Sequence, residues 1–381
     1  MSTTVSEEVA LSVENLRKAF ENEEVLRGID LSIRRGEFCV VVGPSGSGKS
    51  TLLKCIAGLL DYDDGRVTIG GRDVSGVPVE KRDIGFVFQD FEERLFPHMT
   101  VYENAAFGLR HRDDGLDEAE IDRRITEMLE LLAITDTRDS LPSELSGGQQ
   151  QRVELARQLV RQCDVMLLDD PLADLDYKLQ KRMELEMRRI HRELDSTFVY
   201  VTHNQDQALK LADKLVVMNE GMIEQSGTPD EVYATPATAF VARFVGDSNQ
   251  LVGTVESVDG DEVVVDTGAG PIRAVPRGDP DAGDRTMVVV RPEDLTIGDG
   301  AEDCDNQLGV TVAGRTYTGE ETEFTVTVDS VEQDFQVLLP GNVPAGAVAG
   351  RTRVGWDAPD GVCYGQLSVS GAVGVDDLVE V

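Results

Sequence analysis

The chain has 381 residues, 40% of them hydrophobic, which is enough for two or three globular domains with buried cores. Its net charge of -35 and its sequence pI of about 4.3 exclude a general nucleic-acid binder, because such proteins need a clustered basic surface to neutralise phosphates. Five scattered cysteines without CxxC spacing exclude a disulfide framework and a zinc site, and they fit a reducing compartment.

The acidic excess extends along the whole chain, and no lysine follows Lys214. We interpret it as the surface of a halophile, because at 1 M salt a Debye length of roughly 3 Å screens self-repulsion. The alternative is a moderately acidic protein of a mesophile. Residues 1–10 lack the basic and apolar regions of a signal peptide, and no apolar run approaches the ~18 residues of a membrane span. We therefore expect any membrane role to act through partner proteins.

Residues 11 to about 235 alternate short apolar strands with amphipathic helices, which predicts an α/β domain with a largely parallel sheet. Strands are expected at residues 38–42, 165–168 and 198–201, and the helices that follow them at residues 49–60, 179–194 and 204–212. Two further helical stretches, residues 118–133 and 147–162, predict a helical subdomain over about residues 90–162.

From about Asn249 the sequence changes to β-branched runs that are separated by Gly, Asp and Pro. This pattern predicts a small all-β domain. The segments that begin Gly253-Thr254-Val255 and Gly309-Val310-Thr311 are loosely alike, which suggests two related halves within that domain.

A phosphate-binding loop is the clearest chemical motif. The pattern GxxxxGK[ST] stands between a predicted strand and a predicted helix, and it comprises Gly43, Pro44, Ser45, Gly46, Ser47, Gly48, Lys49, Ser50 and Thr51. The glycines let consecutive backbone N–H groups surround phosphates at a helix N-terminus. Lys49 adds a positive charge toward the β- and γ-phosphate oxygens, and Ser50 offers a hydroxyl to Mg²⁺. The alternative, a Gly/Ser turn that only joins strand to helix, does not explain the complete motif.

A second motif indicates which class of phosphate-binding protein the loop belongs to. Residues 145–152 read Leu-Ser-Gly-Gly-Gln-Gln-Gln-Arg, and the helix after them leads into a strand that ends Leu168-Asp169-Asp170-Pro171. In this order and spacing the motifs resemble the ATP-binding cassette (ABC) family. In that family the LSGGQ segment presents a serine, glycine amides and a helix N-terminus to the γ-phosphate bound by the opposite subunit. Taken alone, Ser-Gly-Gly before a helix is better explained as an N-cap and turn.

The resemblance implies roles for further residues. It implies adenine stacking for Phe20, contact with the γ-phosphate for His203, Mg²⁺ binding for Ser50, Gln89 and Asp169, and contact with the opposite subunit's ATP for Ser146, Gly147, Gly148, Gln149 and Asp176. Asp169 ends an apolar strand, where a carboxylate can hold Mg²⁺ or cap a helix. Considered alone, a phenylalanine such as Phe20 is more often a core residue. A lone histidine such as His203 is a core or capping residue at least as often as it is a functional one.

Asp170 departs from the family's pattern, which has glutamate at this position as the general base or water-positioning group. The carboxyl groups of aspartate and glutamate differ by only about 0.4 unit in pKa. The difference that matters is therefore the length of the side chain. Aspartate is one methylene shorter, and a displacement of about 1 Å can cost about 100-fold in rate. Either a small backbone shift compensates for the exchange or the chain hydrolyses ATP slowly. We expect the former, with Asp170, His203, Gln89 and Lys49 as the catalytic residues.

Two regions outside the nucleotide motifs bear on the class of transporter. Residues 90–98 are about two residues longer than is usual in the importers that the chain resembles, and we interpret them as a tolerated bulge on a surface that faces the permease. Residues 221–244 resemble the connector that leads to an OB-like regulatory domain in some importers. Residues 290–295 and 319–323 resemble segments of that OB-like domain. This branch includes ATPases for polyamines, ferric iron, sulfate or molybdate, thiamine, sugars and glycerol phosphate. Spermidine or putrescine is the leading candidate.

We therefore expect an α/β P-loop ATPase domain at residues 9–245, with the helical subdomain inside it, and a β-barrel regulatory domain at residues 246–381. The resemblance implies an importer ATPase that uses Mg²⁺ with ATP. It implies a homodimer or pseudo-dimer at the cytoplasmic face of the membrane, on two integral membrane permease subunits, with an extracellular solute-binding protein as an indirect partner. The alternatives are a soluble ABC ATPase, which usually has a tandem cassette or coiled-coil insertion, a weakly hydrolysing regulatory subunit, which only Asp170 favours, and an exporter, which the C-terminal domain disfavours.

Overall fold

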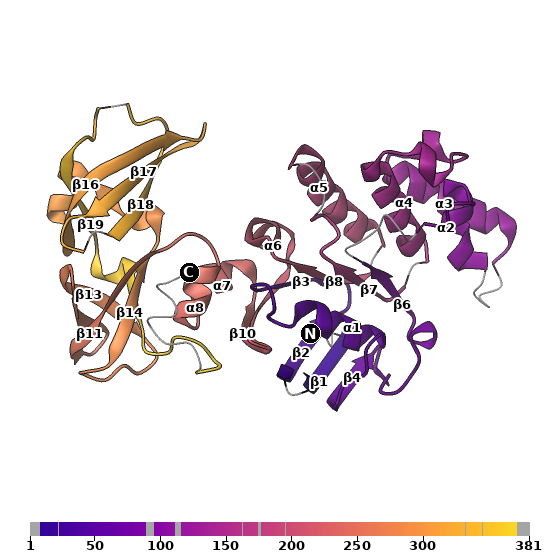
Figure 1. The fold of residues 1–381 in the computed structure, drawn as a ribbon, viewed down its shortest axis with the longest axis horizontal. Coiled ribbons are helices and arrows are strands. Elements are labelled where there is room, and N and C mark those ends of the chain that lie inside the picture. The colour runs from indigo at the N-terminus through magenta and orange to yellow at the C-terminus, as the bar shows by residue number, and fades with distance from the viewer. Residues whose placement is uncertain are drawn as a thin grey trace, which may run out of the picture. The chain divides into compact units, whose positions relative to one another are not determined.

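The protein, seen in a computed structural model, forms two compact units, residues 1–229 and 230–381, which are described separately (Figure 1). The structure describes residues 8–21, 23–88, 95–110, 116–161, 163–173, 177–194, 196–331, 333–344 and 346–371. Within these ranges no helix is both long and apolar enough to cross a membrane.

The first unit begins with an antiparallel sheet that the sequence analysis did not anticipate. Its order is β2-β1-β4-β5, and its strands span Glu23–Arg34, Val9–Phe20, Asp64–Ile69 and Arg72–Asp73. In β2 the buried Ile29, Leu31 and Ile33 alternate with exposed residues, which is the period of a strand with one covered face. The predicted alternation of strands with helices therefore begins at β3 and not at residue 11.

A six-stranded sheet forms the centre of the first unit, in the order β10-β9-β3-β8-β7-β6. Its strands span Met222–Gly227, Lys214–Asn219, Phe38–Val42, Thr197–Thr202, Val165–Asp169 and Ile84–Val87. The neighbours from β9 to β6 pair in parallel, and β10 is antiparallel. Every residue of β3, β7 and β8 is buried, as is typical of a sheet with both faces covered. The predicted parallel sheet is confirmed.

The helices that follow β3, β7 and β8 are α1 (Lys49–Ala57), α5 (Tyr177–Leu194) and α6 (Gln205–Leu211). They lie close to the predicted ranges. α1 ends before the predicted Leu60 because Gly58 takes a left-handed conformation with φ of 75°, and its N–H bonds to the carbonyl of Cys55. Parallel strands bring their carboxyl ends to one edge of the sheet, so the loops into these three helices meet there.

Three further helices pack against one another: α2 (Val101–Arg110), α3 (Glu118–Leu131) and α4 (Gly147–Leu159). Figure 1 shows them grouped together and apart from α1. Asp117 caps α3, because its side chain accepts a hydrogen bond from the N–H of Glu120 at 2.8 Å. The described part of the unit also contains 3₁₀ turns at Val79–Lys81, Thr135–Thr137 and Pro142–Glu144. These helices lie within the expected subdomain, whose bounds stay a prediction.

The second unit is built almost entirely of strands, as predicted. A closed barrel has the order β11-β12-β13-β20-β14, with bounds Asn249–Asp259, Glu262–Thr267, Gly270–Arg277, Gly361–Tyr364 and Arg285–Val290. A five-stranded sheet has the order β15-β19-β16-β17-β18, with bounds Thr296–Ile297, Arg351–Trp356, Asn306–Tyr317, Glu321–Val328 and Gln333–Pro340. One core cluster joins the two sheets and includes Val265, Phe324 and Trp356. The 3₁₀ turns are Pro292–Asp294, Gly298–Asp303 and Ala358–Asp360.

Two buried asparagines link the halves of the second unit in matching ways. Asn249, at the start of β11, exchanges hydrogen bonds of 2.7 Å with both the N–H and the C=O of Gln336 in β18. Asn306, at the start of β16, makes the same pair of bonds to Arg273 in β13, at 2.8 and 2.9 Å. Both asparagines begin a long bulged strand of a three-stranded meander. The structure thus agrees with the two related halves that the sequence suggested.

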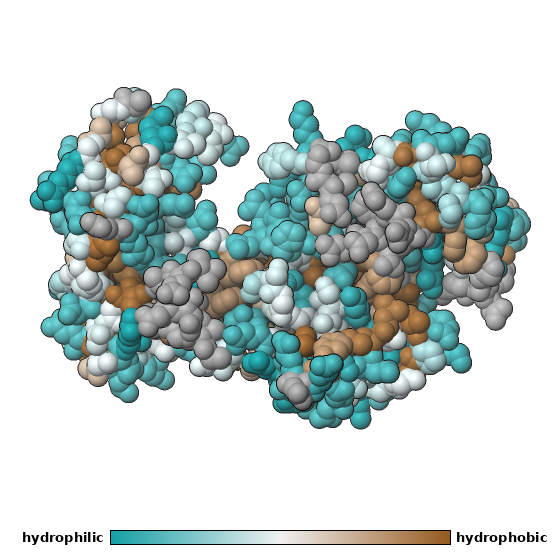
Figure 2. Space-filling model, viewed as in Figure 1, coloured by the Kyte–Doolittle hydropathy of each residue, from teal (hydrophilic) through white to brown (hydrophobic). Residues whose placement is uncertain are grey.

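Residues 230–245 pack with the second unit. They carry most of α7 (Pro229–Ala234) and all of α8 (Ala239–Phe244), and Ala239 and Ala242 belong to a core cluster with Met287 and Tyr364. The domain boundary expected at 245/246 stays a prediction, and the compact unit begins at residue 230. Figure 2 shows hydrophilic residues over much of the visible face of each unit, in keeping with the acidic composition.

Candidate active site

The phosphate loop connects β3 to α1, and two of its glycines, Gly43 and Gly48, stand where a side chain would not fit. A Cβ atom on Gly43 would lie 2.1 Å from the carbonyl oxygen of Met218. Gly48 has φ of 95°, and a Cβ atom there would lie 2.9 Å from the carbonyl oxygen of Val25. Gly48 caps α1 without a side-chain hydrogen bond. The first N–H groups of α1 are therefore available to an anion.

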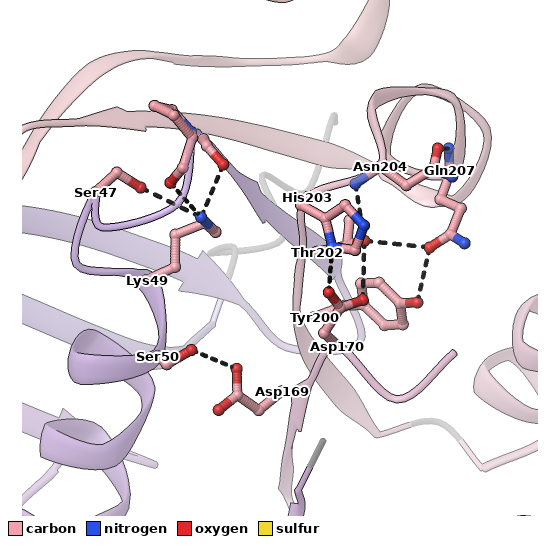
Figure 3. Close-up of polar contacts among 12 residues, drawn as sticks. Ser47, Lys49, Ser50, Asp169, Asp170, Tyr200, Thr202, His203, Asn204 and Gln207 are labelled. Carbon is pink, nitrogen blue, oxygen red and sulfur yellow. Dashed lines mark hydrogen bonds and ion pairs between the residues drawn. The ribbon is translucent and has the colours of Figure 1, made fainter. Parts of the chain in front are cut away.

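Lys49 reaches across the phosphate loop (Figure 3). Its ammonium donates to the carbonyl oxygens of Gly43 at 2.7 Å and Pro44 at 2.8 Å, and it lies 3.3 Å from the hydroxyl of Ser47. Burial lowers the pKa of Lys49, while the carboxylates of Asp170 and Asp169 act in the opposite direction. The loop thus holds a buried cation whose direct partners are neutral atoms.

Ser50 and Asp169 come together beneath the loop, as the Mg²⁺ prediction requires. The hydroxyl of Ser50 donates to Oδ1 of Asp169 at 2.8 Å, and burial raises the pKa of Asp169. A hydroxyl and a carboxylate are hard oxygen donors, and Mg²⁺ in nucleotide sites is held by one or two such groups together with phosphates and water. The pair therefore fits this ion. Gln89, the third predicted ligand, lies outside the described residues, and Thr51 follows Ser50 within α1.

Asp170 is fixed in an unusual backbone conformation directly after β7. Its φ is 43°, and its N–H donates to the carbonyl of Val201 in β8 at 2.9 Å. Its Oδ1 accepts from the hydroxyl of Thr202 at 3.2 Å, and its Oδ2 lies 2.5 Å from Nδ1 of His203. The structure thus brings together two predicted catalytic residues that are 33 positions apart in the sequence.

A buried polar network behind Asp170 was missed by the sequence analysis. Gln207 in α6 accepts through Oε1 from Tyr200 at 3.0 Å and contacts the hydroxyl of Thr202 at 3.3 Å. Asn204 caps α6, and its own N–H donates to the Thr202 hydroxyl at 3.1 Å. Tyr200 and Thr202 are alternate residues of β8, so strand periodicity places them on one face. That period was a usable signal, whereas nothing in the sequence marked Gln207.

Ser146 and Gln149 form a capping box at the start of α4. The N–H of Ser146 donates to Oε1 of Gln149 at 2.9 Å, and the hydroxyl of Ser146 accepts from the N–H of Gln149 at 3.4 Å. Ser146 and Gly147 are exposed, and no hydrogen bond joins residues 146–149 to the phosphate loop within the described chain. The action of these residues in trans remains a prediction, as does that of Asp176, which lies outside the described residues.

Phe20 is the last residue of β1, and it is 44% exposed. The alternative reading of Phe20 as a core residue does not hold. The ammonium of Lys18 lies 5.3 Å from the centre of the Phe20 ring and also pairs with Asp63 at 3.1 Å. An exposed aromatic ring can stack on a base, and the adenine-stacking role of Phe20 stays a prediction.

Comparison with known families matches two parts of the chain. The family described as ABC transporter matches residues 26–173, and the TOBE domain matches residues 288–363. The first range contains the phosphate loop and the segment that ends with Asp170, and the second lies within the β-rich unit.

Curated relatives match most of the chain. The spermidine/putrescine import ATP-binding protein PotA of Thermobifida fusca is 45% identical over 91% of this chain and 90% of its own length. The proteins of the same name in Rubrobacter xylanophilus and Aliivibrio fischeri are 43% and 41% identical, over 83% and 85% of this chain and 83% and 86% of their own lengths.

Solved structures resemble more than half of the chain. CbiO1 of Clostridium perfringens, part of the ABC transporter complex CbiONQ, matches with a TM-score of 0.56 and 32% identity over 60% of this chain and 92% of its own. The ATP-binding cassette MJ0796, in a dimeric post-hydrolysis state bound to ADP and Pi, matches with a TM-score of 0.52 and 29% identity over 57% of this chain and 98% of its own. With the near full-length relatives, these matches show that the chain belongs to the ABC transporter family of import ATP-binding proteins.

Proposed function

We propose that the chain binds MgATP at this site and hydrolyses it to drive the import of a polyamine, spermidine or putrescine, through separate permease subunits. The solute is supported by the names of relatives that share 41% to 45% identity over more than four fifths of the chain. The hydrolytic part is carried by one observation: Lys49, Ser50 and Asp169 converge on the phosphate loop, with Asp170 and His203 beside them (Figure 3).

Each of these residues has a physical task. The loop amides, the N-terminus of α1 and Lys49 would hold the β- and γ-phosphates and stabilise the charge that spreads over the transferring phosphoryl group. Ser50, Asp169 and Gln89 would hold Mg²⁺, which when bound neutralises the charge of the phosphate oxygens. Asp170 and His203 would act together on the attacking water and the γ-phosphate.

The assembly that we propose is a dimer on a permease. Residues 146–149 and Asp176 would complete the ATP site of the second copy, in keeping with the dimeric state named for MJ0796. Closure of the dimer would be transmitted to two integral membrane subunits at the cytoplasmic face of the membrane, with an extracellular solute-binding protein delivering the polyamine. The acidic surface would keep the chain folded in concentrated salt, so the assays below use multimolar KCl.

The hydrolytic step is tested with the purified full-length chain, Mg²⁺ and ATP. We expect the wild type to release phosphate, Asp170→Asn to lose at least about 100-fold in rate because the carboxylate is gone, and Asp170→Glu to remain active. Binding of a fluorescent ATP analogue is measured in parallel and should change little. A wild type that binds ATP but releases no phosphate would refute the hydrolytic proposal.

The solute is tested in cells. A strain that lacks the gene for this chain should lose uptake of labelled spermidine and regain it with the wild-type gene but not with Lys49→Ala, which removes the phosphate-binding charge. Uptake of labelled sulfate and thiamine serves as the control and should not change. Normal spermidine uptake with loss of another solute would leave the ATPase proposal intact and reject the polyamine.

A further inference from the structure

We propose that Arg157 is a positioning residue that transmits movement of α4 to the turn at residues 95–100, because its guanidinium holds the ring of Phe96. This inference rests on the proposed transport function and deepens it. It names the contact by which closure of the dimer at residues 146–149 would reach the surface that is predicted to face the permease.

The two ends of α4 lie at two different sites. Its first turn carries the capping box of Ser146 and Gln149, in the segment that is predicted to contact the second copy's ATP. Arg157 lies in its last turn. A helix of 13 residues is about 20 Å long, and α4 packs against α2 through one buried face. A packed helix moves as a rigid element, so displacement of its first turn also displaces Arg157.

The contact between Arg157 and Phe96 joins α4 to the turn. The guanidinium carbon of Arg157 lies 4.6 Å from the centre of the Phe96 ring, whose other neighbour is Phe107 of α2 with ring centres 4.5 Å apart. The side chain of Arg157 is 20% exposed, and its Nη1 lies 3.6 Å from Oε2 of the buried Glu154. A cation that is largely removed from water attracts an aromatic ring more strongly than an exposed one. The ring is thus held by both helices.

One buried amide fixes the backbone of the turn. Asn104 of α2 is fully buried, and its Oδ1 accepts from the N–H of Phe96 at 2.8 Å. Its Nδ2 lies 3.2 Å from the carbonyl oxygen of Phe96, 3.0 Å from that of Met99 and 3.0 Å from that of Thr100. Buried hydrogen bonds are costly to break. The backbone of the turn therefore follows any movement of the Phe96 ring and of α2.

The turn directs its anchors inward and its tip outward. Leu95 is buried, Phe96 is half-buried, and Pro97 and His98 are exposed. These four residues are the described part of the stretch 90–98, which the sequence predicts to face the permease. Movement of α4 thus reaches the exposed tip through two contacts, that of Arg157 with Phe96 and that of Phe96 with Asn104.

Hydrogen exchange in the isolated full-length chain tests whether the ring contact holds the turn. Phe96→Leu removes the face of the ring but keeps an apolar side chain and the pair of Arg157 with Glu154. We expect the amides of residues 95–100 to exchange about 2- to 30-fold faster in this variant, the range that follows from the strength of a cation–ring contact. The amides of α1 should be unchanged. Phe96→Tyr retains the ring and should exchange as the wild type.

A second variant removes the cation. Loss of Arg157 alone would leave Glu154 buried without its opposite charge, which can unfold a protein. The double variant Glu154→Gln/Arg157→Gln avoids this, and Glu154→Gln alone is its matched control because the guanidinium remains over the ring. We expect faster exchange at residues 95–100 in the double variant and not in the control.

The decisive experiment separates transport from hydrolysis. Phe96→Leu and the double variant should hydrolyse ATP within about twofold of the wild type as isolated chains, since neither lies at the phosphate loop. In complemented cells we expect spermidine uptake per membrane-bound copy of the chain to fall by about 2- to 30-fold, as for mutations in a coupling network. Phe96→Tyr and Glu154→Gln should retain uptake. The three substitutions combined should cause no loss beyond that of either variant, because both break one contact.

Three results would overturn the inference: exchange at residues 95–100 or uptake that equals the wild type in both variants, hydrolysis that falls as much as uptake, which indicates a general loss of structure, or losses of uptake that add when the variants are combined. Each of them leaves the proposed function standing, provided that the wild type hydrolyses ATP and restores uptake. A wild type that does neither refutes the proposed function, and this inference is refuted with it.

Discussion

The buried polar side chains of the two units differ in how completely protein groups satisfy them. In the first unit Lys49 and Asp169 are buried at the phosphate loop, and burial shifts the pKa of each toward its neutral form. No carboxylate in the described ranges lies within ion-pair distance of the Lys49 ammonium, which bonds to two carbonyls and a hydroxyl. In the second unit Asn249 and Asn306 are equally buried, but each amide satisfies both polar groups of one backbone residue.

The difference separates two uses of a buried polar group. A buried charge without an opposite charge beside it lowers stability, so a fold retains it only where a ligand later completes its surroundings. A buried amide with complete hydrogen bonds stabilises the fold and fixes the register of its strands. Polar residues at the phosphate loop should therefore be needed for activity and not for stability, and the asparagines should show the reverse.

Replacement of Lys49 by methionine should have the largest effect of the predictions here. We expect Lys49→Met to lower ATP hydrolysis by at least about 100-fold, because the charge that stabilises the transferring phosphoryl group is lost. The midpoint of thermal unfolding without nucleotide should stay the same or rise, because the substitution removes a buried charge. ATP should no longer raise that midpoint, since ligand binding to the folded state is what raises it.

The control for this prediction lies in the 3₁₀ turn Val79–Lys81. Lys81 is exposed, so Lys81→Met should leave hydrolysis and unfolding close to those of the wild type. A clear fall in the nucleotide-free midpoint of Lys49→Met, absent in Lys81→Met, would mean that Lys49 stabilises the fold and would contradict the comparison.

Removal of either asparagine should lower the stability of the second unit by about 2 to 4 kcal/mol, because two buried backbone groups lose their partners. The variants are Asn249→Ala and Asn306→Ala. The chain has one tryptophan, the buried Trp356 in the core of this unit, so its fluorescence during urea unfolding reports on the second unit alone. Hydrolysis by the isolated chain should stay within about twofold, since neither asparagine lies in the first unit.

The exposed Gln307 is the matched control for Asn306. Gln307→Ala removes a side-chain amide that bonds to the carbonyls of Glu302 and Cys304, and we expect a loss below about 1 kcal/mol. Equal losses in Asn306→Ala and Gln307→Ala would contradict the assignment of the buried amide as a structural link. Unequal losses in Asn249→Ala and Asn306→Ala would show instead that the two halves differ in their dependence on it.

The sequence predicted the first unit best where one strong pattern decides the structure. The apolar run of residues 38–42 and the glycine motif after it gave β3, the phosphate loop and the start of α1. The motif and the family resemblance also predicted that Ser50 and Asp169 lie at one Mg²⁺ site, and the structure brings the two side chains within hydrogen-bond distance. The antiparallel sheet of β1 and β2 was not anticipated, although the alternation of residues 29–33 was a signal for it.

Other features depend on contacts that no local pattern encodes. The asparagine links join residues that are 87 and 33 positions apart, and they depend on the register of strands in both halves. Asp170 could be recognised as a departure from the family, but its contacts could not be predicted. Its φ of 43° and its bond to Val201 follow from the pairing of β7 with β8. The roles of Gln89 and Asp176 stay predictions.

His191 allows a smaller test of the same comparison within the first unit. This residue of α5 is buried with its ring 5.0 Å from those of Phe38 and Phe198, and its Nε2 has no hydrogen-bond partner in the described chain. Burial lowers the pKa of His191 below its usual value. The folded state therefore favours the neutral ring, and the stability that depends on it is present above the pKa of the unfolded chain, about 6.5, and is lost as the pH falls through the folded pKa.

His191→Phe should remove that part of the acid sensitivity, because phenylalanine fits among the same rings and cannot be protonated. We expect the free energy of unfolding of the first unit, followed by circular dichroism in urea, to fall less between pH 7 and pH 5 in the variant than in the wild type. His98→Gln changes an exposed histidine and should keep the wild-type slope. If the His191→Phe slope equals that of the wild type, this ring is not a source of the acid sensitivity. The instability assigned to buried polar groups in the first unit is then confined to its phosphate loop.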